Sequence, residues 1–68
     1  MRTIYTYYKN SNTGQLIKEQ RFEDISFVCP VFQYDCNGKQ INPVDLAGFV
    51  RISEQKFIRE CRYKKANP

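Results

Sequence analysis

The residues of this sequence best suited to a chemical role are arginines and lysines, which gather toward its C-terminal end. The stretch FIRECRYKK, residues 57–65, contains four of the eleven basic residues of the chain. Guanidinium groups stay charged at neutral pH and bind phosphate or carboxylate groups through two parallel hydrogen bonds. We therefore predict a basic binding surface that consists of Arg51, Lys56, Arg59, Arg62, Lys64 and Lys65. The same charges would also suit an ordinary solvated helix face, with cations near the C-terminal end of the helix dipole.

A second candidate surface is rich in tyrosine and lies near the start of the chain. Residues 2–9, RTIYTYYK, contain Tyr5, Tyr7 and Tyr8. If this segment is a strand, Tyr5 and Tyr7 lie on one face and Tyr8 on the other. Aromatic side chains on a sheet can stack on unpaired bases or anchor a protein interface. In a small sheet they also serve as core residues or cross-strand pairs, so the sequence leaves both roles open.

Catalysis is not predicted, because the side chains that usually perform it are missing or badly placed. The chain has no histidine, so neither a Ser–His nor a Cys–His pair can form. The remaining acid pairs, such as Glu23 with Asp24, lie in predicted turns, where acidic residues have structural uses. The three glycines form none of the known phosphate-binding loops. We expect no enzyme activity and no cofactor.

The cysteines do not predict a metal site. Cys29, Cys36 and Cys61 are too few to complete a structural zinc site in a chain without histidine. We expect them to be small buried thiols. A Cys29–Cys36 disulfide or an intermolecular disulfide is the alternative.

The composition is that of one small folded domain. The 68 residues are 41% hydrophobic and 15% aromatic, which is too apolar for a disordered chain. No stretch approaches the roughly 18 apolar residues of a membrane-spanning helix, and the N-terminal residues do not resemble a signal peptide. We therefore expect a cytoplasmic protein without a membrane partner. The net charge of +4 favours acidic partners.

Four strands are predicted from segments rich in β-branched and aromatic residues. They lie at residues 2–9, 15–22, 27–35 and 39–42. The polar segment NSNTG at 10–14 and the Asn37–Gly38 pair are typical of hairpin turns. Pro30 lacks a backbone N–H, so its strand is predicted to be an edge strand or to be bulged at that point.

A helix is predicted over about residues 43–64. Asn42 suits the N-cap position and Pro43 the first helical position. At 100° per residue, five apolar residues fall within about 120° of one another. They are Leu46, Phe49, Val50, Phe57 and Cys61. The alternative is a short helical turn near 43–48 followed by a β-hairpin, because GFVRIS has the composition of a strand and Ser53–Glu54 could restart a helix. The polar tail at 65–68 is expected to be frayed.

These elements predict an α+β domain: a small antiparallel sheet of three to four strands in residues 2–42, packed by one amphipathic helix at about 43–64. The inward side of the helix would pack against sheet residues Ile4, Phe27, Val31, Phe32 and Ile41. The alternative is a mostly β fold of five short strands with one helical turn near 43–48.

The predicted function is that of a small non-enzymatic binding protein, whose basic face engages nucleic acid or a nucleic-acid-processing complex. The alternative is an inhibitor of the anti-CRISPR or antirestriction kind, as found on phages and plasmids, which binds a host protein and blocks its nucleic-acid-binding surface. That alternative is an analogy based on size and charge. A homodimer is a further expectation, since an edge strand at Pro30 would leave backbone groups free for pairing.

Overall fold

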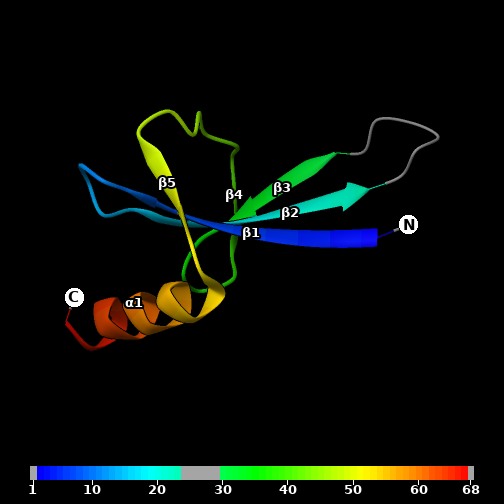
Figure 1. The fold of residues 1–68 in the computed structure, drawn as a ribbon. Helices are drawn as coiled ribbons and strands as arrows, with labels where there is room; N and C mark the ends of the chain where they lie inside the picture. Colours follow the sequence, from blue (N-terminus) through cyan, green and yellow to red (C-terminus); the bar gives the residue numbers. More distant parts are fainter. Residues whose placement is uncertain (1, 24–29, 68) are drawn as a thin grey trace.

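The structure is a computed structural model that describes residues 2–23 and 30–67, and these residues form one sheet and one helix (Figure 1). The elements are β1 (Arg2–Asn10), β2 (Leu16–Glu23), β3 (Val31–Tyr34), β4 (Gln40–Ile41), β5 (Phe49–Ile52) and α1 (Glu54–Ala66). The strands are antiparallel and lie in the order β4-β3-β2-β1-β5. The predicted α+β class is confirmed, and the fifth strand is also compatible with the mostly β alternative.

Both predicted hairpin turns are present. In the first turn, Asn10 Oδ1 accepts hydrogen bonds from two backbone N–H groups, and the Gly14 N–H donates to the Asn10 carbonyl at 2.8 Å. In the second turn, Asp35 Oδ1 accepts from the N–H groups of Asn37 and Lys39 at 2.8 and 3.0 Å. Asparagine and aspartate close turns in this way because their short side chains reach the backbone two or more residues further on.

The prediction that Pro30 lies in an edge strand or in a bulge is wrong. Pro30 directly precedes β3 rather than lying within it. A proline at that place removes no hydrogen bond from the sheet, so no bulge is needed. β3 pairs with both β2 and β4 and is therefore an inner strand, and the edges are β4 and β5. Residues 27–29 of the predicted strand lie outside the described residues.

The helix begins about ten residues later than predicted. Gly48 has a φ of +83°, which is left-handed and does not continue a right-handed helix. The next four residues, FVRI, form β5 and pair with the free edge of β1. The chain then enters α1, which continues to Ala66, so residues 65 and 66 are helical rather than frayed. The alternative of a helical turn near 43–48 and a following β-hairpin does not form here. What matches is the observation that GFVRIS has the composition of a strand and that Ser53–Glu54 could restart a helix.

The sheet is covered on both faces at one end. Phe57 and Cys61 of α1 pack with Leu16 of β2 on one face. The opposite face is crossed by the connection from β4 to β5, because these strands are at opposite edges. Gln33 binds this connection by accepting from the Val44 N–H at 2.9 Å and donating to the Val44 carbonyl at 3.4 Å. Ile17, the neighbour of Leu16 on the opposite face, is 0% exposed.

The predicted core is confirmed in part. Phe57 and Cys61 are buried as expected, and Tyr7, Cys36 and Ile52 pack against them. Other residues predicted to be buried are partly or largely exposed, because they do not belong to the helix or lie beyond its reach: Leu46, Phe49, Val50, Ile4, Val31, Phe32 and Ile41. Phe27 lies outside the described residues.

In the part of the chain that the structure describes, no helix has the length and apolar character needed to cross a membrane.

Candidate binding surface on the helix

Helix α1 is positioned by a cap at its start and by two buried side chains on its inner side. Ser53 is the N-cap, and its Oγ accepts a hydrogen bond from the Lys56 N–H at 3.1 Å. This bond satisfies one of the free N–H groups in the first turn. The buried residues of the helix are Phe57 and Cys61, which are four positions apart and thus lie on one side. The residues on the opposite side must face solvent.

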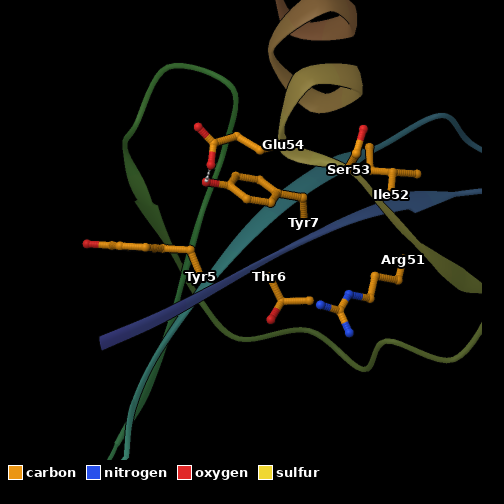
Figure 2. A pocket seen from close by; sticks show the side chains of 7 residues that line it. All are labelled: Tyr5, Thr6, Tyr7, Arg51, Ile52, Ser53 and Glu54. Carbon is orange, nitrogen blue, oxygen red and sulfur yellow. Dashed lines mark hydrogen bonds between the residues drawn. The ribbon is translucent and has the colours of Figure 1, made fainter. Parts of the chain in front are cut away.

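Tyr7 fixes the beginning of the helix against β1. Its ring lies 5.0 Å from the ring of Phe57, centroid to centroid. Its hydroxyl donates to Glu54 Oε2 at 3.2 Å, as Figure 2 shows. Burial raises the pKa of Tyr7, and the nearby Glu54 carboxylate raises it further. Tyr7 therefore has a structural role in this arrangement, and its ring is not free to stack on a base.

Two lysines fix the remainder of the helix to the first hairpin. Lys9 Nζ and Glu60 Oε1 form an ion pair at 2.6 Å. The hydrogen bond from Lys9 lowers the pKa of Glu60, although partial burial of the carboxylate opposes this effect. Lys64 Nζ donates to the carbonyl of Gly14 in the hairpin turn. Lys64 was predicted to be a binding residue, but its ammonium group is directed to the protein backbone.

The solvent side of α1 presents Gln55, Ile58, Arg59 and Arg62, which line a shallow hollow of about 370 Å³. We call these four residues the outer face. Lys56 and Lys65 are also exposed on the helix and flank this face. The ion pairs among the described residues join Lys9 to Glu60 and Arg21 to Glu19. The four cations of the helix that point to solvent, Lys56, Arg59, Arg62 and Lys65, take no part in these pairs.

Arg51 does not belong to the outer face. It lies on β5, where it is opposite Tyr8 of β1, whereas its neighbour Ile52 is opposite Tyr7. Because Tyr7 faces the helix, Arg51 lies on the other face of the sheet. Figure 2 shows Arg51 beside Thr6, on the side of β1 away from Glu54. The predicted grouping of Arg51 with Arg59 and Arg62 assumed one continuous helix and is wrong for this reason.

The three tyrosines do not form one stacking surface. Tyr5 and Tyr7 share a face, as predicted, and Tyr8 lies on the other. Tyr5 is 45% exposed, and the ammonium of Lys18 lies 4.5 Å from the centre of its ring. Such a contact is a cation–π interaction. A hollow of about 400 Å³ runs from Tyr5 to Glu54 and includes Arg51 (Figure 2), but only one exposed aromatic ring borders it.

Two exposed apolar side chains were not predicted as part of the surface. Ile58 is 40% exposed and Tyr63 is 68% exposed. The helical spacing contained the signal for both, since Ile58 falls at the margin of the apolar side and Tyr63 falls outside it. Exposed apolar side chains of this size are typical of protein interfaces when they cluster.

The described residues form neither a metal-binding cluster nor an activated nucleophile. Within residues 2–23 and 30–67, no group of three or more cysteine or acidic side chains is placed to hold a metal ion. Cys36 and Cys61 are free thiols, and their sulfurs are 2.6 Å apart. Burial raises the pKa of the Cys61 thiol to about 12, and the contact with Cys36 adds to the effect. Cys61 is therefore a neutral thiol near neutral pH and a poor nucleophile.

The structure thus brings Lys56, Arg59, Arg62 and Lys65 together on one helix, and it separates Arg51, Tyr8 and the ammonium of Lys64 from them. Neither a known family model nor a curated protein nor a solved structure matches this chain.

Proposed function

We propose that this chain is a cytoplasmic, non-enzymatic binding protein that engages the phosphate backbone of nucleic acid, alone or within a nucleic-acid-processing complex, through the outer face of α1. The observation that carries this proposal is the position of Arg59 and Arg62. Both guanidinium groups lie on the solvent side of one helix and outside the ion pairs of the described residues. A guanidinium group in such a place is free to bind a phosphate through two hydrogen bonds.

The length of the basic segment limits how many phosphates it can reach. Lys56 and Lys65 are nine residues apart, which corresponds to about 14 Å along a helix that rises about 1.5 Å per residue. Phosphates follow one another about every 3.4 Å along one strand of B-form DNA, measured along the axis. This length matches about four phosphates. Nine residues also turn the helix by about 180°, so Lys56 and Lys65 flank Arg59 and Arg62 from opposite sides and the two arginines are the central contacts. The binding would be weak and independent of sequence, because phosphate contacts carry no sequence information.

The test is a titration of labelled duplex DNA, single-stranded DNA and duplex RNA by fluorescence anisotropy at several salt concentrations. The logarithm of the association constant should fall linearly with the logarithm of salt, with a slope for duplex DNA between about −2 and −4. Arg59→Ala with Arg62→Ala should reduce this slope by about 2, since each phosphate contact contributes about 0.9. The loss should be the same for unrelated sequences.

Arg51→Ala is the matched control for the single variant Arg59→Ala, which should reduce the slope by about 0.9. Arg51→Ala removes the same charge from an exposed arginine, but on the sheet face away from the outer face. We expect its affinity and salt slope to remain close to those of the unmodified protein. If Arg51→Ala weakens binding as much as Arg59→Ala, the outer face is not the site, and the hollow between Tyr5 and Glu54 takes its place.

A second candidate is an inhibitor of the anti-CRISPR or antirestriction kind that binds a host protein. The exposed Ile58 between Gln55, Arg59 and Arg62 favours it, because an apolar side chain gains from contact with protein and not with phosphate. In that case Ile58→Ala would weaken a stoichiometric protein complex that persists after nuclease treatment, whereas it would leave the binding of nucleic acid unchanged.

The homodimer stays a prediction. β5 is an edge strand, and its Val50 is 52% exposed. An edge strand can pair with a second copy of the same strand.

A further inference from the structure

Two cysteines that are distant in sequence lie side by side in the structure. Cys36 belongs to the turn between β3 and β4, and Cys61 lies on the inner side of α1. They are 25 positions apart, and their Sγ atoms are 2.6 Å from one another. Cys61 is buried, whereas Cys36 is partly exposed. The sequence predicted buried thiols, with a Cys29–Cys36 or an intermolecular disulfide as the alternative, and Cys29 lies outside the described residues.

Both sulfurs are held in place by their surroundings. The turn that contains Cys36 is closed by hydrogen bonds of Asp35, whose N–H donates to the Lys39 carbonyl at 3.0 Å and whose Oδ1 accepts from the Lys39 N–H. Cys61 is held by the packing of Phe57 and Leu16 around it. A disulfide bond is about 2.05 Å long, so the two sulfurs need to approach by only about half an ångström.

We propose that Cys36 and Cys61 form a reversible intramolecular disulfide that joins the β3–β4 turn to α1, with a small-molecule disulfide such as glutathione disulfide as the oxidant. The thiolate of Cys36, the more exposed residue, attacks one sulfur of glutathione disulfide and expels glutathione thiolate. The thiolate of Cys61 then attacks the Cys36 sulfur of the mixed disulfide and expels the second glutathione. Two protein thiols and one glutathione disulfide thus give one protein disulfide and two glutathione molecules, which receive the two protons.

The second step should show an unusual dependence on pH. Cys36 from the turn is in contact with Cys61, Tyr7 from β1 packs against the same core cluster, and Lys64 and Lys65 of α1 act on Cys61 through their charge. The lysines favour the thiolate, but burial outweighs them and raises the pKa of Cys61 to about 12. Burial also acts on Cys61 in the mixed disulfide, so closure should continue to accelerate as the pH rises above 9. A thiol with an ordinary pKa of about 8.5 would gain less than twofold above that pH.

The bond would stabilise the fold without touching the outer face. It closes a loop that contains the crossing connection, β5 and the first half of α1. Cross-linking a loop of this length removes freedom from the unfolded chain, and for a domain of this size the melting temperature should rise on the order of 10 °C. The proposal is independent of what the outer face binds.

The experiment is to equilibrate the purified protein with glutathione and glutathione disulfide at a series of ratios, and then to block free thiols by alkylation. Cleavage before Asp35 separates Cys29 from Cys36, so that mass spectrometry can identify the linked pair. We expect the Cys36–Cys61 disulfide together with the higher melting temperature. Cys29→Ser should keep both effects, and Cys36→Ser should lose both.

Alkylated Cys36 and Cys61 at every ratio would overturn the proposal, as would a disulfide that contains Cys29 in place of either residue. If Cys36→Ser does not fold, the mapping of the unmodified protein and of Cys29→Ser decides the question.

Discussion

At the scale of single residues, Phe57 makes the main apolar contact between α1 and the sheet. It is buried with Leu16 and Cys61, and its ring packs on that of Tyr7 at 5.0 Å between centroids. Its neighbour Ile58 lies on the solvent side of the helix. Two adjacent apolar residues of one helix therefore have opposite surroundings, which makes them a suitable pair for comparison.

Phe57→Ala should lower the free energy of unfolding by about 3–5 kcal/mol, because it removes a buried aromatic ring and leaves a cavity. Ile58→Ala should change this free energy by about 0.5 kcal/mol or less, as is usual for exposed sites. Urea unfolding followed by circular dichroism measures both values. Equal losses for the two variants would mean that the helix is packed in a different rotation from the one described.

Residue-level predictions succeeded where they depended on spacing within one element. The inward positions of Phe57 and Cys61 and the outward positions of Arg59 and Arg62 follow from the helical repeat. The place of Arg51 could not be obtained in this way, because it depends on where the helix begins. Ile17 illustrates a further limit, since its full burial, on the sheet face opposite α1, could not be obtained from the spacing within its own strand.

At the scale of elements, the boundary between β5 and α1 depends on a competition between two signals. The apolar spacing over residues 46–61 favours a single helix, whereas the β-branched and aromatic FVRI favours a strand. The strand forms because the free edge of β1, from Tyr7 to Asn10, provides its partners. A prediction from local sequence cannot include the hydrogen bonds to a partner strand that is about forty residues away in the sequence. The signals for the correct boundary, Gly48 and Ser53, were nevertheless present.

The cap at Ser53 should contribute measurably to stability. Ser53→Ala removes the acceptor of the Lys56 N–H and should lower the free energy of unfolding by about 1 kcal/mol. Ser53→Asp should retain most of it, because aspartate is also a good N-cap and its charge suits the start of the helix. Thermal unfolding of the three proteins provides the comparison. If alanine and aspartate behave alike, the helix does not begin at this residue.

At the scale of the whole molecule, the strand order determines how the second face of the sheet is covered. β4 and β5 lie at opposite edges, so the connection between them must cross β3, β2 and β1. α1 and this connection cover one end of the sheet, and β1, β2 and β3 extend beyond the helix (Figure 1). The accessible surface of 5167 Å² exceeds the roughly 4,500 Å² expected for a compact protein of this mass. Because little of the surface is buried, the contacts that hold the β4–β5 connection should contribute to the free energy of unfolding of the whole domain.

Gln33 holds the β4–β5 connection against the sheet. Its buried amide holds both the N–H and the carbonyl of Val44. Gln33→Ala should therefore lower the free energy of unfolding by about 1–3 kcal/mol, since it leaves these backbone groups without their partner. Gln40→Ala is the control, because Gln40 is exposed on the adjacent strand β4, and it should have little effect.

Hydrogen exchange distinguishes a loosened connection from a general loss of stability. In Gln33→Ala, the Val44 amide should exchange faster by a larger factor than the amides that pair β1 with β2, because the connection opens locally while the hairpin remains intact. In Gln40→Ala both sets should stay as they are. If the Val44 amide exchanges at the same rate with and without the Gln33 side chain, then the connection is held by other contacts.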